Sequence, residues 1–204
     1  LCLVGSEMCI RDRIGSILFN SLGRRSFDLV ANKGFNIFFD IKFHDIPNTV
    51  AQSILSFRDY PINLLTVHIS GGMSMLISAR EAAHAIKSKI IGVSLLTSLD
   101  QKDIKRVFFN DTQKVADNLF DLAKEAKMDG IVCSAHELKY AMTNIPNLLK
   151  IVPGIRLSSN NDDQKRVMSP AEALDLGANH LVIGRPITES KHPNAELEKI
   201  YETL

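Results

Sequence analysis

Three charged residues lie close together at the end of an apolar run. Residues 35–42, FNIFFDIK, have the composition of a buried strand, yet they contain Asp40 and Lys42, and Asp45 follows. Residues two apart in a strand share a face, so Asp40 and Lys42 would project together. Acidic neighbours would keep Lys42 protonated and make it a candidate proton donor. The alternatives are a structural ion pair and, for Asp45 before Pro47, a helix cap.

A second set of residues could bind an anion. The stretches VPGIR (152–156) and VIGRP (182–186) each end an apolar run with a glycine and an arginine. Gly184 would let the backbone approach a phosphate closely, and Arg185 would offer it a bidentate fork. The alternative is that Arg156 and Arg185 are surface charges beside turn glycines. Residues 157–166 between the two stretches are polar throughout, which fits either a lid or a solvated loop.

Repeated βα units are needed to position these residues. Short β-branched or aromatic runs alternate with stretches of helical period, and Pro47 and Pro170 mark helix starts. The expected strands are 35–42, 64–70, 90–97, 130–134, 150–155 and 180–185.

Polar residues at the ends of nearly every expected strand decide between two α/β folds. They favour a (β/α)₈ barrel over an open doubly wound sheet, because a barrel builds its site from many strand ends. Residues of this kind are Asp40, Lys42, Ser70, Thr97, Ser134, Arg156 and Arg185. Eight strands are required, so we expect the first one or two to be missing or replaced at the N-terminus.

Composition excludes several classes of protein. The 204 residues contain 24 Lys and Arg against 23 Asp and Glu, so no net field would attract nucleic acid or an anionic membrane. No apolar run approaches the length of a membrane span. The three cysteines are an odd number without metal-ligand spacing, which predicts a reducing compartment and no metal site. We therefore expect a cytoplasmic protein.

Several motifs, in order, are similar to those of the orotidine 5'-phosphate decarboxylase family. They are DIKFHDIPNT (40–49), LLTS (95–98), PGIR (153–156), DQKR (163–166) and IGRP (183–186). The resemblance implies a (β/α)₈ barrel of the ribulose-phosphate-binding type that forms a homodimer. It also implies decarboxylation of orotidine 5'-monophosphate to UMP and CO₂ in pyrimidine biosynthesis, without metal or organic cofactor.

The resemblance also assigns roles to individual residues. Asp40 would sit beside the substrate carboxylate, Lys42 would donate the proton to C6, and Asp45 and Thr49 would reach into the partner's site. The remaining substrate-binding residues would be Thr97 and Ser98 at the pyrimidine, Arg156, Gln164, Gly184 and Arg185 at the phosphate, and Pro153.

The N-terminus departs from the family pattern. The family has a first strand that ends in an Asp and a second that ends in a Lys. Here Arg13 stands in place of that lysine, and residues 1–12 match no part of the pattern. Two readings are a divergent N-terminus and a truncated gene joined to foreign sequence, of which we favour the second. We thus expect one catalytic domain over residues 13–204, a barrel that cannot close its hydrogen-bond ladder unless LCLVG fills a gap, and weak or no activity.

Two other functions fit parts of the sequence. A Mg²⁺-dependent sugar-phosphate decarboxylase or synthase on the same kind of barrel shares the Asp-x-Lys-x-x-Asp run. A non-catalytic remnant that only binds UMP-like ligands would share the phosphate motifs.

Overall fold

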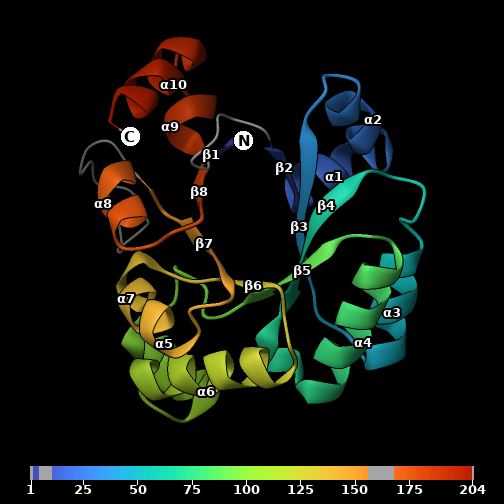
Figure 1. Ribbon diagram of the computed structural model, residues 1–204, viewed down its shortest axis with the longest axis vertical. Coiled ribbons are helices and arrows are strands. Elements are labelled where there is room, and N and C mark those ends of the chain that lie inside the picture. The colour runs from blue at the N-terminus through green and yellow to red at the C-terminus, as the bar shows by residue number, and fades with distance from the viewer. Residues whose placement is uncertain (1, 5–10, 156–167, 204) are drawn as a thin grey trace.

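The chain folds into a closed ring of strands surrounded by helices. The computed structural model describes residues 2–4, 11–155 and 168–203. The strands run in chain order around the ring, as Figure 1 shows. They are β1 Cys2–Val4, β2 Arg11–Gly15, β3 Asn36–Phe43, β4 Ile62–His68, β5 Lys89–Val93, β6 Gly130–Val132, β7 Leu149–Pro153 and β8 His180–Ile183. The predicted barrel, and all six of the predicted strands, are confirmed.

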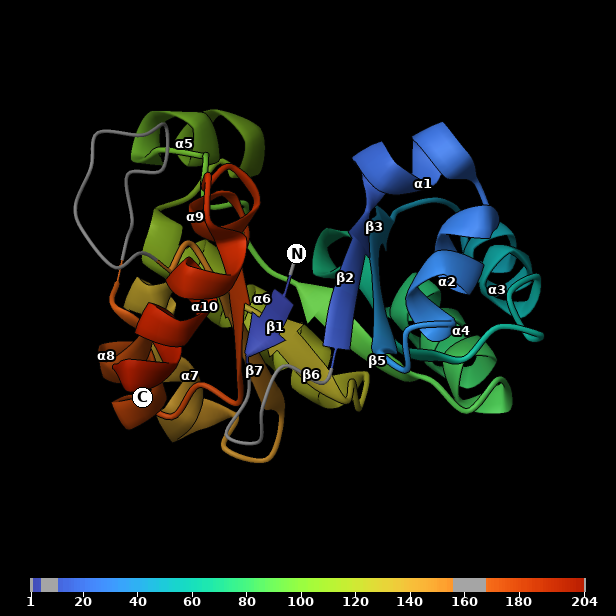
Figure 2. The same cartoon turned by 90° about the horizontal axis from the view of Figure 1, so that it is seen from above.

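Helices follow most of the strands and form the outer layer (Figures 1 and 2). They are α1 Ser16–Leu22, α2 Arg25–Ala31, α3 Pro47–Leu55, α4 Met73–Ala85, α5 Gln101–Phe108, α6 Thr112–Glu125, α7 Ala135–Asn144, α8 Pro170–Asp175, α9 Arg185–Thr188 and α10 Pro193–Glu202, with a 3₁₀ turn at Ile69–Gly71. Pro47 and Pro170 begin α3 and α8 as predicted, because proline suits the first helical position.

The ring closes because Cys2–Val4, within the LCLVG segment, fills the gap, which is the condition under which closure is predicted from the sequence. β2 through β8 pair in parallel, whereas β1 lies antiparallel to both of its neighbours and joins β8 to β2. Cys2 pairs with Asp12 on one side and with Ile183 on the other. The N-terminal segment thus replaces a parallel strand, because a short extended peptide of either direction can satisfy two open sheet edges.

Two apolar layers hold the barrel together. Phe38, Leu64, Ile91 and Ile151 fill the interior of the ring. A much larger cluster lies between the strands and the helices. Alternation along the strands separates the layers: Phe38 points inward and Phe39 outward. The same alternation places Asp40 on the inner face with Phe38, at the mouth of the barrel, whereas Ser70 and Ser134, also predicted there, do not line the cavity.

Candidate active site

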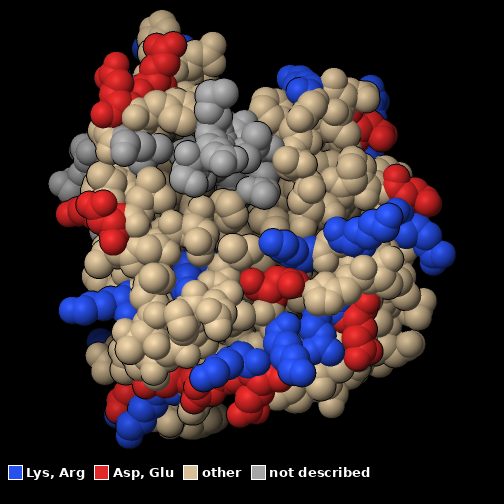
Figure 3. Space-filling model, in the orientation of Figure 1, with Lys and Arg blue, Asp and Glu red and all other residues tan. Residues whose placement is uncertain are grey.

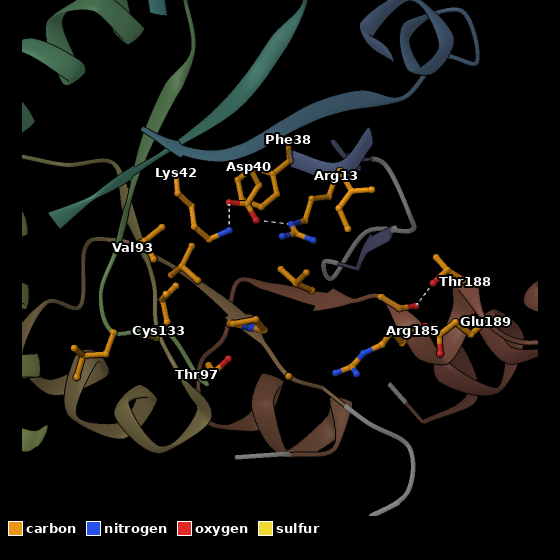
Figure 4. A pocket seen from close by; sticks show the side chains of 18 residues that line it. Arg13, Phe38, Asp40, Lys42, Val93, Thr97, Cys133, Arg185, Thr188 and Glu189 are labelled. Carbon is orange, nitrogen blue, oxygen red and sulfur yellow. Dashed lines mark hydrogen bonds and ion pairs between the residues drawn. The ribbon is translucent and has the colours of Figure 1, made fainter. Parts of the chain in front are cut away.

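A cavity of about 520 Å³ opens at the carboxyl ends of the strands. Its lining comes from β2, β3, β5, β6, β7, β8 and the turns that follow them, and Figure 4 shows side chains converging from these elements. This is the end of a (β/α) barrel at which active sites are found. Acidic and basic side chains are interspersed over the face of the molecule drawn in Figure 3.

Asp40 is the centre of an ion-pair cluster on one wall of this cavity. Its Oδ1 accepts a hydrogen bond from the Lys42 amine at 2.9 Å, and its Oδ2 accepts one from Arg13 Nε at 2.5 Å. The side chain of Asp40 is 7% exposed, while those of Lys42 and Arg13 are 28% and 21% exposed. The carboxylate is therefore buried beneath two cations that reach the cavity. The prediction that Asp40 and Lys42 share the inner face is confirmed.

These contacts determine the charge state of Asp40. Burial by itself would raise the pKa of the carboxyl group, because a charged group loses hydration in the interior. The charges of Arg13 and Lys42, together with their hydrogen bonds, outweigh burial and hold the pKa of Asp40 below its usual value. A carboxylate that is ionised at neutral pH thus holds the Lys42 amine at the cavity wall.

An irregularity in the sheet places Lys42. Phe39 pairs with Leu65 and Phe43 with Val67, so three residues of β3 lie opposite Thr66 alone. Lys42 has a φ of 56°, a left-handed conformation that is uncommon for a residue other than glycine. Its backbone N–H donates to Thr66 Oγ1 at 2.9 Å, and the Thr66 hydroxyl donates to Asp40 Oδ1 at 2.9 Å.

The opposite wall carries the residues predicted to bind an anion. Gly184 and Arg185 lie where β8 passes into α9, and Pro153 ends β7. All three line the same cavity as Asp40 and Lys42, as does Thr97 in the turn after β5. Figure 4 shows Arg185 across the cavity from the Asp40 cluster. A cation–carboxylate pair and the turn predicted to bind an anion thus line one cavity.

Other predicted site residues lie elsewhere. Asp45 and Thr49 are exposed and do not line this cavity, and Asp45 Oδ1 accepts a hydrogen bond from the N–H of Ile46. Ser98 is exposed beside Thr97 and is not part of the lining. Arg156 and Gln164, with the polar stretch 157–166, fall outside the described residues.

Sequence reasoning missed two parts of the site. Thr66 is completely buried and contacts both Asp40 and the backbone of Lys42. Its only signal was a hydroxyl within an apolar strand. The second part is an apolar portion of the lining, which a sequence cannot distinguish from ordinary core: Phe38, Val93, Leu95, Val132, Cys133 and Val182.

Within residues 2–4, 11–155 and 168–203, no group of three or more His, Cys, Asp or Glu side chains is arranged to hold a metal ion. Among the described helices, none has the length and apolar character needed to cross a membrane.

Fold and site together define a (β/α)-barrel protein whose cavity is lined by a lysine–carboxylate pair on one wall and by Gly184 and Arg185 on the other. The model of the orotidine 5'-phosphate decarboxylase / HUMPS family matches residues 4–200. The chain belongs to this family.

Individual relatives agree with this assignment. An orotidine 5'-phosphate decarboxylase of Saccharophagus degradans is 41% identical over 195 residues, which cover 93% of this chain and 82% of the relative. One of Ehrlichia chaffeensis is 42% identical over 192 residues, 92% of this chain and 83% of the relative. The crystal structure of the Lactobacillus acidophilus enzyme superposes with a TM-score of 0.81 at 31% identity, covering 94% and 85% of the two chains.

Proposed function

We propose that this chain decarboxylates orotidine 5'-monophosphate to UMP and CO₂. The observation that carries the proposal is the placement of the Lys42 amine, held on Asp40, in the same cavity as Gly184 and Arg185. A substrate with a phosphate at one end and a reacting carboxylate at the other would span that cavity. Family membership and relatives of this name at about 40% identity support the same activity.

The chemistry requires stabilisation of negative charge. Loss of CO₂ leaves a carbanion at C6, and the ammonium of Lys42 stabilises that charge as it develops. The same group then donates its proton to C6. Asp40 lies beside the substrate carboxylate, and it holds the amine before substrate arrives. Charge stabilisation is strong here because the carboxylate and its partners are largely removed from water.

Binding of the phosphate contributes at a distance from the reacting carbon. Arg185 binds phosphate oxygens and Gly184 lets the backbone approach them, together with Arg156 and Gln164 from outside the described residues. Thr97 and Ser98 bind the pyrimidine, and Pro153 contacts the substrate. Binding energy from the phosphate end then holds the carboxylate against the Asp40 cluster.

The homodimer belongs to the same proposal. Asp45 and Thr49 are exposed on the β3–α3 segment, where Ile46 leaves an apolar side chain 66% exposed. An exposed apolar side chain between polar ones is suited to a subunit interface. We assign Asp45 and Thr49 to the partner's site. In this proposal the chain acts in the cytoplasm and needs no cofactor. Its substrate is a nucleotide, and it binds neither nucleic acid nor a membrane.

Arg13 determines how active the chain is. Residues 13–204 form the catalytic domain in this proposal, and Arg13 keeps the cation that the family places beside Asp40. A guanidinium is larger and more rigid than an ammonium, so it reduces the room for substrate. We expect turnover well below that of the Saccharophagus relative and partial recovery in Arg13→Lys. Turnover equal to that of the relative would contradict this part of the proposal.

The deciding experiment follows absorbance as orotidine 5'-monophosphate becomes UMP, with and without a chelator. Turnover that survives the chelator supports the proposal, whereas turnover of a sugar phosphate that the chelator abolishes favours the Mg²⁺-dependent alternative. Calorimetry with UMP and uridine adds a second readout, since UMP should bind at least about tenfold more tightly through its phosphate. Binding of UMP without any turnover would identify a non-catalytic remnant.

A further inference from the structure

Thr66 lies at a position where a hydroxyl has no role in packing. Its neighbours Leu65 and Val67 face the helices, whereas Thr66 faces the interior beside Leu64 and is completely buried. The apolar side chains of this interior layer are Phe38, Leu64, Ile91 and Ile151. A buried hydroxyl is unfavourable unless its hydrogen bonds are satisfied, and both bonds of Thr66 go to the Asp40–Lys42 segment.

The first bond supports the backbone of Lys42. Three residues of β3 lie opposite Thr66, so the regular ladder is interrupted there. Thr66 Oγ1 accepts the Lys42 N–H that the ladder no longer pairs, and Lys42 has the left-handed φ of 56°. An unfavourable conformation of this kind persists only where its surroundings hold it. The hydroxyl therefore fixes the point from which the Lys42 side chain starts.

The second bond has a direction that follows from the first. A backbone N–H can only donate, so the Thr66 oxygen is the acceptor in its bond with Lys42, and its own proton is left for Asp40 Oδ1. That carboxylate oxygen also accepts from the Lys42 amine. The three residues form a closed ring of hydrogen bonds. Thr66 Oγ1 contacts the backbone N–H of Lys42 and also Asp40 Oδ1, the oxygen that accepts from the Lys42 amine.

We propose that Thr66 is a positioning residue for the decarboxylation, which fixes both ends of Lys42 through this ring. The inference rests on the function proposed above for Lys42. Thr66 does not line the cavity, so it acts only through Asp40 and Lys42. The charged and titratable groups around the ring are Arg13 from β2, Asp40 and Lys42 from β3 and His68 from β4.

The test compares Thr66→Val, which keeps the shape but removes the hydroxyl, with Thr66→Ser, which keeps the hydroxyl. We expect kcat to fall at least about 30-fold in Thr66→Val while KM changes less than about threefold, because the phosphate wall is intact. Thr66→Ser should stay within about threefold of the parent kcat. Ser88→Ala is the matched control, since it removes a buried hydroxyl that donates to Ile62 O at the far end of the barrel.

One further measurement and one further variant distinguish a positioning role of Thr66 from a folding defect and from a failure of the proposed reaction. The ¹³C resonance of the Asp40 carboxylate reports its titration without any turnover, and its pKa should rise in Thr66→Val but not in Thr66→Ser, because one donor to the carboxylate is lost. If Thr66→Val does not fold, Thr66→Cys replaces it, since a thiol is a weak donor.

Each outcome decides the proposal. Equal kinetics in Thr66→Val and Thr66→Ser, or an unchanged Asp40 titration, would overturn it, as would an equal loss in Ser88→Ala. If the parent chain has no activity, the proposed function fails and the titration alone still tests the role of Thr66.

Discussion

Arg13 and Lys42 hold opposite oxygens of the Asp40 carboxylate. These ion pairs add little net stability, because the attraction between buried charges is largely offset by the free energy needed to remove them from water. The arrangement is well suited to orienting an amine, since the carboxylate cannot rotate while both of its oxygens are bound. At the scale of residues, the site is thus a fixed acceptor that presents a cation to the cavity.

Replacement of Lys42 tests the proton donor. We expect Lys42→Ala to lose at least about 100-fold in turnover, the usual contribution of a positioned acid, while UMP still binds through the phosphate wall. Turnover and UMP calorimetry measure the two effects separately. Lys89→Ala is the control, because Lys89 is exposed at the start of β5, at the other end of the barrel. Near-normal turnover in Lys42→Ala would remove Lys42 from the mechanism.

Asp40 should make stability depend on acid pH. Its pKa is lower in the folded chain than the ordinary 3.8, so the ionised carboxylate stabilises the fold above that pH. The contribution disappears as the pH falls through the lower folded-state pKa. We expect Asp40→Asn to cost on the order of 2 kcal/mol at neutral pH and progressively less below about pH 4.

Chemical denaturation at a series of pH values measures this difference. The exposed Asp59, substituted as Asp59→Asn, serves as the control. If the difference in free energy of unfolding between the parent chain and Asp40→Asn does not become smaller in acid, the ionisation of Asp40 is not coupled to folding.

At the scale of elements, β3 and the segment after it direct side chains both into the cavity and onto the surface outside it. The irregular pairing of β3 with β4 aims Lys42 inward, whereas Pro47 begins α3 and leaves Asp45 and Thr49 exposed outside the cavity. In the proposed dimer, this stretch of ten residues would supply the cation of its own site and polar groups for the partner's site. That division would account for the position of Asp45 outside the cavity of its own chain.

Mixing two inactive variants tests the assignment of Asp45 to the partner's site. Lys42→Ala and Asp45→Ala chains, refolded together, should recover about a quarter of the parent turnover, since half of the dimers are hybrids with one intact site each. Activity is measured before and after mixing. Lys42→Ala mixed with Asp40→Asn is the control, because both residues belong to the same site. Recovery in the control, or none in the test mixture, would contradict the assignment.

At the scale of the whole molecule, three residues close the barrel. β1 pairs with β8 on one side and with β2 on the other, and Leu3 lies opposite both Val182 and Arg11. β2 carries Arg13 and β8 leads into Gly184, so both walls of the cavity lie next to this seam. The stability of β1 thus bears on the spacing of the two walls.

Proline at Leu3 tests the seam. Leu3→Pro removes a ladder donor in a strand with neighbours on both sides, and we expect it to lower the free energy of unfolding by about 2–3 kcal/mol. Urea denaturation measures the change, and Leu3→Thr, which keeps the N–H, is the control. Unchanged stability would show that β1 contributes nothing to the closed barrel.

The sequence determined six of the eight strands, the starts of α3 and α8, and the inward pairing of Asp40 with Lys42, because these depend on local periodicity and on the rule that parallel strands end at one edge. Only the tertiary structure decided how β1 closes the ring, how Thr66 joins Asp40 to Lys42 and which oxygen Arg13 binds. The physical reason is that strand direction, sheet irregularities and buried hydrogen bonds depend on neighbours far apart in the chain, which no local pattern records.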